Sequence, residues 1–296
     1  LVKIVAAGIC HSDDAIRMGD TSYAFPAVLG HEGAGIIEKV GKAVKAFKAG
    51  DHVVLSYLYC GQCSSCKTGM PSSCDDWLSL NNVGTREDGS YVFHREDGTP
   101  ISNFFGQSSF STYSLVHESN VTKVDPSVDL RLVGPLGCGF LTGSGTVFNG
   151  LKPNPGSTIA IFGTGAVGLA AIMAAKISGC IKIIGIDIHD HRLETAKELG
   201  ATHVINSKTT NVKKEIKKIT GGKGVNFSID TTGVPAVMRA SLEVLSIGGV
   251  AAPIALTSKT IEVNTLFDLT LFNRSIKGIC MGAAIPQLSI PQLVEF

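Results

Sequence analysis

The stretch that decides the fold is Thr158-Ile-Ala-Ile-Phe-Gly163-Thr-Gly165-Ala-Val-Gly168. Its apolar start, Thr158–Phe162, predicts a buried strand, and the uncharged run that begins at Ala166 predicts a buried helix. At such a turn the first glycine permits a tight bend, the second lets the backbone approach a pyrophosphate, and the third lets helix and strand pack closely. The helix N-terminus would then face the phosphates. Taken alone, the pattern is equally typical of an ordinary tight turn between a strand and a helix.

An acidic residue further along favours the dinucleotide interpretation. Asp187 ends the predicted strand Lys182–Asp187 and lies nineteen residues after Gly168. A carboxylate at that place accepts hydrogen bonds from ribose hydroxyls and repels a 2′-phosphate, so we expect NAD rather than NADP. The next residues include His189, His191 and Arg192, so some tolerance of the 2′-phosphate of NADP stays open.

The rest of the second half alternates between strand and helix patterns. The predicted segments are helices near Arg192–Leu199, at Asn211–Thr220 and after Pro235, and strands at His203–Asn206, Val225–Asp230, Val250–Ile254 and Ser275–Cys280. Repeated units of this length predict a doubly wound parallel sheet with helices on both faces.

The first half has a different pattern. It is rich in glycine and in short apolar runs such as Gly33–Val40, Asp51–Leu55 and Tyr113–Val116. Short strands with frequent turn residues predict a compact, mainly β domain. We expect the border between the two domains near residues 139–150.

Four cysteines lie within fifteen residues, at Cys60, Cys63, Cys66 and Cys74. Two-residue gaps let successive thiolates turn back onto one ion, and the longer gap is a loop that brings in the fourth ligand. Four sulfur ligands make a closed tetrahedral site, which is typical of structural zinc. A pair of local disulfides is the alternative, and the otherwise intracellular character of the chain disfavours it.

Three further candidates for metal ligands are far apart in the sequence. They are Cys10 in Cys10-His-Ser-Asp13, His31 in Gly30-His-Glu-Gly33 and Cys138 in Gly137-Cys-Gly139. Two thiolates and one imidazole would leave a fourth position open, as in catalytic zinc sites. Spacing cannot show that they meet: Cys138 could be a small core residue, and His31 an ordinary buried histidine.

Composition excludes some classes of function. The 296 residues carry 26 basic and 25 acidic side chains, so there is no basic field for nucleic acid or an anionic membrane. The uncharged run from Pro153 to Ala175 contains prolines and glycines that argue against a membrane span. No signal peptide is visible, and we expect a cytoplasmic protein. Because the chain begins at Leu1 and stops at Phe296 inside an amphipathic run, both ends look cut.

Together these motifs resemble the zinc-dependent medium-chain alcohol dehydrogenases over essentially the whole chain. The resemblance rests on Gly8–Asp14, Gly30–Gly35, Gly50–Val54, the four-cysteine segment, Leu136–Gly139 and the Gly163–Gly168 turn. Within that family, Phe105-Gly-Gln-Ser-Ser-Phe110 and Gly134-Pro-Leu-Gly-Cys138 look most similar to the aryl (benzyl) alcohol dehydrogenase branch.

The resemblance implies a GroES-like catalytic domain over 1–141 and an α/β Rossmann domain that binds NAD over 142–285. Residues 286–296 would begin the return to the catalytic domain, which would be incomplete at both ends. It also implies two zinc ions per chain, a catalytic one on Cys10, His31 and Cys138 and a structural one on the four-cysteine segment. Cofactor contacts are implied for His11, Thr142, Gly163, Gly165, Ala166, Val167, Gly168, Asp187 and Arg192.

Roles in catalysis follow from the same resemblance. Ser12 is expected to accept the proton of the alcohol hydroxyl, Asp13 to orient the ligating histidine, and Glu32 to lie close behind the metal. Asp13 could equally be a helix cap. Some relatives end their proton relay on a histidine where this chain has Ala15, so the relay must finish elsewhere.

Tyr57, Phe104 and Phe105 resemble residues that line the substrate cleft, although core aromatics are an equally good explanation. The expected reaction is reversible oxidation of a primary aryl or allylic alcohol to the aldehyde with NAD, by a homodimer or homotetramer. A glutathione-dependent formaldehyde dehydrogenase is one alternative. A non-catalytic dinucleotide-binding relative is another, against which the intact Cys10, His31 and Cys138 speak.

Overall fold

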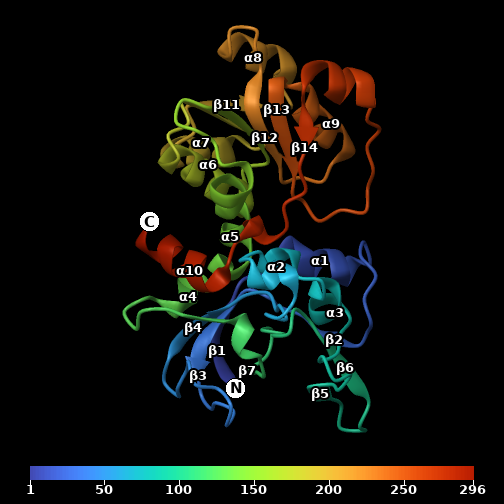
Figure 1. Ribbon diagram of the computed structural model, residues 1–296, viewed down its shortest axis with the longest axis vertical. Helices are drawn as coiled ribbons and strands as arrows, with labels where there is room; N and C mark the ends of the chain where they lie inside the picture. Colours follow the sequence, from blue (N-terminus) through green and yellow to red (C-terminus); the bar gives the residue numbers. More distant parts are fainter. The chain divides into compact units, whose positions relative to one another are not determined.

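The computed structural model describes residues 1–296, which form two compact units (Figure 1). Unit 1 comprises Leu1–Leu141 and Ala284–Phe296, and unit 2 comprises Thr142–Ala283. The point of division falls inside helix α5, Gly139–Gly145. Unit 2 is therefore a continuous segment, whereas unit 1 is built from both ends of the chain.

Unit 2 contains a six-stranded sheet in the order β11-β10-β9-β12-β13-β14, and every pair of neighbours is parallel. Its strands are β9 (Thr158–Phe162), β10 (Lys182–Asp187), β11 (His203–Asn206), β12 (Val225–Asp230), β13 (Leu245–Pro253) and β14 (Ser275–Ile276). Because the first strand of the unit lies in the middle, the sheet grows outward in both directions, which is the doubly wound order of dinucleotide-binding domains.

The helices of unit 2 cover both faces of this sheet. They are α6 (Ala166–Ile177), α7 (Asp190–Leu199), α8 (Val212–Ile219) and α9 (Pro235–Glu243), with short helical turns at Thr146–Leu151, Thr265–Leu269, Thr270–Phe272 and Met281–Ala283. Successive side chains of a strand point to opposite faces. In β9, Ile159 and Ile161 accordingly belong to one buried cluster with α6, while Ala160 and Phe162 belong to another with α8 and α9. The predicted doubly wound sheet is confirmed.

Local sequence explains where these helices begin. The Asn211 side chain accepts a hydrogen bond from the backbone N–H of Lys214 and caps α8, and α9 begins with Pro235 in its first turn. The end of the sheet differs from expectation. Strand β13 begins at Leu245, earlier than predicted, and β14 ends at Ile276 rather than Cys280.

Unit 1 is mainly β, as predicted. A five-stranded sheet has the order β7-β1-β3-β4-β8, and a small sheet has the order β2-β6-β5. The strands are β1 (Val2–Ala7), β2 (Ala27–Val28), β3 (Gly33–Ile37), β4 (His52–Leu55), β5 (Phe93–His94), β6 (Pro100–Asn103), β7 (Tyr113–Ser114) and β8 (Val121–Lys123). All contacts within the larger sheet are antiparallel. Its core contains Val2, Ile37, Val53, Leu55 and Val121.

Short helices join these strands and carry the residues of interest. They are α1 (His11–Met18), α2 (Ser64–Lys67), α3 (Trp77–Asn82), α4 (Leu130–Val133) and α10 (Pro286–Glu295), with single turns at Pro71–Ser73, Glu118–Asn120 and Gly134–Gly137. No helix in the structure combines the length and apolar character needed to cross a bilayer. The uncharged run that begins at Pro153 instead forms β9, the glycine turn and most of α6.

Candidate functional site

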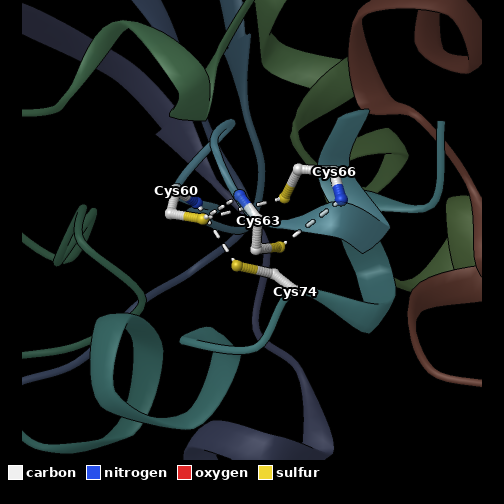
Figure 2. A group of neighbouring side chains, drawn as sticks. All are labelled: Cys60, Cys63, Cys66 and Cys74. Carbon is white, nitrogen blue, oxygen red and sulfur yellow. Dashed lines mark hydrogen bonds between the residues drawn. The ribbon is translucent and has the colours of Figure 1, made fainter. Parts of the chain in front are cut away.

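The four clustered cysteines meet at one point of unit 1. Their sulfur atoms all lie within 4.8 Å of one another, and Figure 2 shows them directed toward a common space. Backbone N–H groups of Gln62 and Cys63 donate to Cys60 Sγ at 3.4 Å, and that of Cys66 donates to Cys63 Sγ at 3.5 Å. Such donors stabilise thiolates. All eight cysteines of the chain are free thiols, so the disulfide alternative is not what the structure contains.

A second group brings together the distant candidates. Ligand atoms of Cys10, His31, Glu32 and Cys138 lie within 4.8 Å of one another. Cys10 is the N-cap residue of α1, and His31 and Glu32 directly precede β3. Cys138 lies between the turn Gly134–Gly137 and α5. The fold thus joins three segments, of which that of Cys138 lies more than a hundred residues beyond the other two.

Asp13 holds the histidine in place. Its Oδ2 lies 3.1 Å from His31 Nδ1, and both side chains are buried. The same carboxylate accepts from the backbone N–H of Gly30 at 2.8 Å and from that of Cys10 at 3.3 Å. Asp13 therefore completes the capping box of α1, whose N-cap residue is Cys10, and also contacts the histidine.

His31 Nε2 is the atom that fits a metal. It is buried and has no hydrogen-bond partner on the chain, which is costly for a polar atom unless another ligand satisfies it. With Nδ1 turned to Asp13, Nε2 faces the two thiols. Two sulfurs and one nitrogen at these positions fit a zinc ion with an open fourth position.

The three candidate ligands differ in how readily they lose a proton. The hydrogen bond from Cys138 lowers the pKa of Cys10 to about 4, whereas the same contact and burial raise the pKa of Cys138 well above its usual range. Burial lowers the pKa of His31, but the neighbouring Asp13 carboxylate and Cys10 thiolate outweigh it and bring that pKa to about 10. Without metal, His31 and Cys138 hold protons that a cation would displace, whereas Cys10 is already a thiolate at neutral pH.

Glu32 is buried behind the same atoms. Its Oε1 accepts from the backbone N–H of Gly139 at 3.1 Å, next to Cys138. Burial, followed by the charge on Cys10, raises the pKa of Glu32 to about 7. A Cβ atom at Gly8 would lie 2.1 Å from Glu32 Oε2, so the carboxylate occupies space that only glycine leaves free. Ser12 is half-buried, with Oγ 3.7 Å from Cys10 Sγ.

The three aromatic residues expected to contact substrate are all buried. The rings of Phe104 and Phe105 pack against His31 at centroid distances of 5.2 and 4.9 Å. Trp77 packs edge-on against Phe105 at 5.6 Å. Tyr57 is fully buried, and its hydroxyl donates to the Ala284 carbonyl at 2.6 Å. Two of the three thus form an apolar wall beside the candidate metal, while Tyr57 also connects β4 with the C-terminal part of unit 1.

The glycine turn of unit 2 has the geometry expected of a phosphate loop. Gly163 has a positive φ of 87°, and a Cβ atom at Gly168 would lie 1.9 Å from the Gly163 carbonyl oxygen. A Cβ atom at Gly165 would meet no protein atom within 4 Å. The first and third glycines are thus needed by the fold itself. The second leaves open space at the N-terminus of α6, where Ala166 and Val167 form the first turn.

Asp187 lies at the end of β10, next to this turn. Its Oδ2 accepts from Thr164 N at 2.8 Å and Thr164 Oγ1 at 3.0 Å, and its Oδ1 accepts from the N–H groups of Ile188 and His189. The structure thus brings Asp187 to the glycine turn. Arg192 Nη1 lies 3.9 Å from Asp187 Oδ2. Thr142 belongs to unit 2 and approaches Met281, while His11 is exposed on α1 of unit 1.

Two buried polar residues near the candidate metal were missed by sequence reasoning. Gln107 lies in a segment that was used only for resemblance, and Ser56 follows β4. Both form hydrogen bonds to the segments that carry His31 and Cys138. No spacing rule links them across 76 and 81 residues, so only the fold could reveal them.

Comparison with known proteins agrees with this geometry. Residues 1–126 match the family described as alcohol dehydrogenase GroES-like domain, and residues 166–296 match zinc-binding dehydrogenase. The chain is 40% identical to geraniol dehydrogenase of Castellaniella defragrans, over 100% of its own length and 80% of that protein.

Solved structures give the same result. An alcohol dehydrogenase zinc-binding domain protein from Burkholderia ambifaria is 44% identical, with a TM-score of 0.95 over 99% of this chain and 80% of that one. Benzyl alcohol dehydrogenase from Acinetobacter calcoaceticus is 43% identical, with a TM-score of 0.93 over the same shares. With its two cysteine-containing clusters and its glycine turn, the chain belongs to the zinc-dependent medium-chain alcohol dehydrogenase family and is an oxidoreductase.

Proposed function

We propose that this enzyme oxidises a primary aryl or allylic alcohol to the aldehyde with NAD, reversibly. The observation that carries the proposal is the group of half-buried Cys10 with buried His31 and Cys138, in which His31 Nε2 lacks a hydrogen-bond partner. Relatives named for geraniol and benzyl alcohol support the substrate class. In both of these alcohols the hydroxyl-bearing carbon is attached to an unsaturated carbon.

The ligand set defines what each cofactor would contribute. When bound, zinc would act as a Lewis acid that lowers the pKa of a hydroxyl, and NAD would accept the hydride. Cys10 and Cys138 would hold the ion through sulfur and His31 through Nε2, while Asp13 keeps the histidine proton on Nδ1. The Ser12 hydroxyl would accept the proton that leaves the alcohol.

The aromatic wall supports the choice of substrate. Phe104 and Phe105 are buried beside His31 and make the surroundings of the candidate metal apolar, which would suit an aryl or allylic group better than a small aliphatic one. We therefore expect benzyl alcohol to be preferred to ethanol.

NAD is proposed as the cofactor because of Asp187. Its carboxylate lies at the end of β10 and is held by four hydrogen bonds from the chain, so a 2′-phosphate would meet a fixed negative charge. The open space at Gly165 would accommodate the pyrophosphate. Arg192 contributes one nearby positive charge and would contact the adenosine ribose.

We further propose a homodimer or homotetramer. Strand β14 is the last strand of the unit 2 sheet and has one unpaired edge, and Ile276 within it and Phe272 shortly before it are exposed. A second copy could pair with this edge. Replacing Ile276 with lysine should shift the mass measured by light scattering toward the monomer, while a mass unchanged at low protein concentration would refute this interface.

The decisive test is NAD reduction with benzyl alcohol, ethanol, or formaldehyde plus glutathione as substrate. Fast turnover on benzyl alcohol supports the proposal, whereas turnover only with the glutathione adduct refutes it. The Ser12→Ala variant separates the proton relay from the metal site. It should reduce kcat by about 10²–10⁴-fold while zinc content stays unchanged, and equal turnover would rule out the relay.

A further inference from the structure

Gln107 connects three backbone groups around the histidine ligand. Its side-chain Nε2 donates to the His31 carbonyl at 2.9 Å and to the Ser56 carbonyl at 3.2 Å, and its Oε1 accepts from Gly33 N at 3.3 Å. The side chain is 2% exposed. One amide therefore holds the residues on both sides of Glu32 and ties them to the end of β4.

Ser56 continues this connection toward a cysteine ligand. Its hydroxyl donates to the Gly137 carbonyl at 2.6 Å, one residue before Cys138, and the serine has no exposed surface. Its backbone carbonyl also accepts from Asn120 Nδ2 at 2.9 Å, so its position is held from a second side. The path from His31 to Cys138 thus runs through two side chains and one backbone segment.

The path complements the contact made by Asp13. Asp13 joins the segments of Cys10 and His31, and the path through Gln107 and Ser56 joins those of His31 and Cys138. Zinc requires Zn–S distances of about 2.3 Å and Zn–N distances of about 2.0–2.1 Å, so the separation of the ligand-bearing loops decides whether both ligands reach one ion. Loops whose polar groups formed hydrogen bonds only with water would not keep that separation.

We propose that Gln107 and Ser56 are positioning residues of the catalytic metal site and fix the separation of the His31 and Cys138 segments. The inference rests on the proposed role of Cys10, His31 and Cys138 as metal ligands. Neither residue belongs to the group of candidate metal ligands. Their effect is on how tightly the ion is held and on the symmetry of its ligand field.

The first test uses Ser56→Ala, which removes one hydroxyl and leaves the backbone unchanged. Ser228→Ala is a matched control, because Ser228 is equally buried in unit 2 and its hydroxyl donates to the Ser241 carbonyl at 2.7 Å. The zinc-loaded protein is mixed with a chelator, and metal release is followed by absorbance. Cys10→Ala supplies the release trace of the four-cysteine site alone.

Ser56→Ala should release the metal at Cys10, His31 and Cys138 at least about tenfold faster than wild type. The Ser228→Ala control should match wild type. The visible spectrum of the cobalt-loaded protein is a second readout, because loss of folding stability alone does not shift the bands of a correctly held ion. Those bands should shift in Ser56→Ala and not in Ser228→Ala. Equal release rates and equal spectra in the two variants would overturn the proposal.

A double substitution tests whether the two residues act in series. Gln107→Met keeps the length of the side chain without its hydrogen bonds. Because either change breaks the same path, the double variant should release metal within about twofold of Gln107→Met alone. Release rates that multiply would show independent effects and would overturn the proposal.

The metal content of the wild-type protein separates this inference from the proposed function. Two metals with unchanged release in the variants would refute only the positioning role. A single metal, held by the four cysteines, would refute the proposed function and the positioning role together.

Discussion

Replacing Asp13 with asparagine tests how the histidine is prepared for the metal. The carboxylate accepts from Gly30 N and Cys10 N and lies 3.1 Å from His31 Nδ1. Asparagine has the same shape, and its oxygen can still accept from Gly30. Its NH₂ group, however, would face two other donors, the Cys10 N–H and the protonated Nδ1 of His31.

The imidazole can relieve that conflict by moving its proton. With an NH₂ group opposite, Nδ1 becomes the acceptor and the proton moves to Nε2, the atom that must bind the metal. Loss of a partner that orients a ligating histidine typically lowers metal affinity about 10–100-fold. That range corresponds to about 1.4–2.7 kcal/mol of binding free energy.

Competition with a chromophoric chelator measures this difference directly, and a metal count shows which site is affected. Asp14→Asn is the matched control, because the neighbouring Asp14 is a surface carboxylate paired with Arg17 at 2.7 Å and is not one of the candidate ligands. Its affinity should equal that of wild type. Asp13→Asn with affinity within twofold of the control would refute the role of Asp13 in setting the histidine tautomer.

Three further predictions follow from the contacts and pKa shifts. Gly165→Ala should leave the melting temperature unchanged but weaken NAD binding at least about tenfold, whereas Gly168→Ala should destabilise unit 2 because its Cβ atom would clash with the backbone. Calorimetry measures the melting temperature, and titration with NAD measures the binding. Equal effects of the two substitutions would contradict the different roles assigned to the two glycines. Zinc uptake at pH 7 should release about two protons, from His31 and Cys138, so the affinity for zinc should fall as the pH falls. Calorimetry in buffers of different ionisation enthalpy measures the number of protons released. Binding heats that do not depend on the buffer would exclude this proton release. The Lys123 ammonium, 2.7 Å from Asp51 Oδ1, holds the pKa of the Asp51 carboxyl below its usual range. The stability that this ion pair contributes is therefore present above about pH 4 and is lost as the pH falls below it. The difference in unfolding free energy between wild type and Asp51→Asn, measured by urea unfolding, should therefore shrink on acidification. A difference that grows on acidification would contradict the prediction.

Local sequence was sufficient for most of unit 2. Strand β9, the three glycines and the start of α6 were predicted from apolar runs and turn residues, because each of these features acts between neighbours in the chain. The four-cysteine cluster was likewise predictable, since two-residue gaps are short enough to dictate one common centre. The end of the edge strand β14 was predicted less accurately, at Cys280 instead of Ile276. A strand paired on one side has few contacts that specify where it ends.

The second metal group needed the family resemblance, and its geometry needed the fold. Cys10, His31 and Cys138 are separated by too many residues for spacing to bring them together. The aromatic residues show the same limit: the sequence could not distinguish core packing from substrate contact, and in the structure Phe104 and Phe105 are both buried and adjacent to His31.

The sequence by itself determined the doubly wound sheet, the glycine turn with Asp187, and the closed sulfur site, because periodicity, turn chemistry and short ligand gaps are local. Only the tertiary structure decided that Asp13 serves both α1 and His31, that Gly8 leaves room for Glu32, and that Gln107 and Ser56 join two ligand loops. These contacts span up to 81 residues. A hydrogen bond between distant segments depends on where the core places them, and no property of either segment alone contains that position.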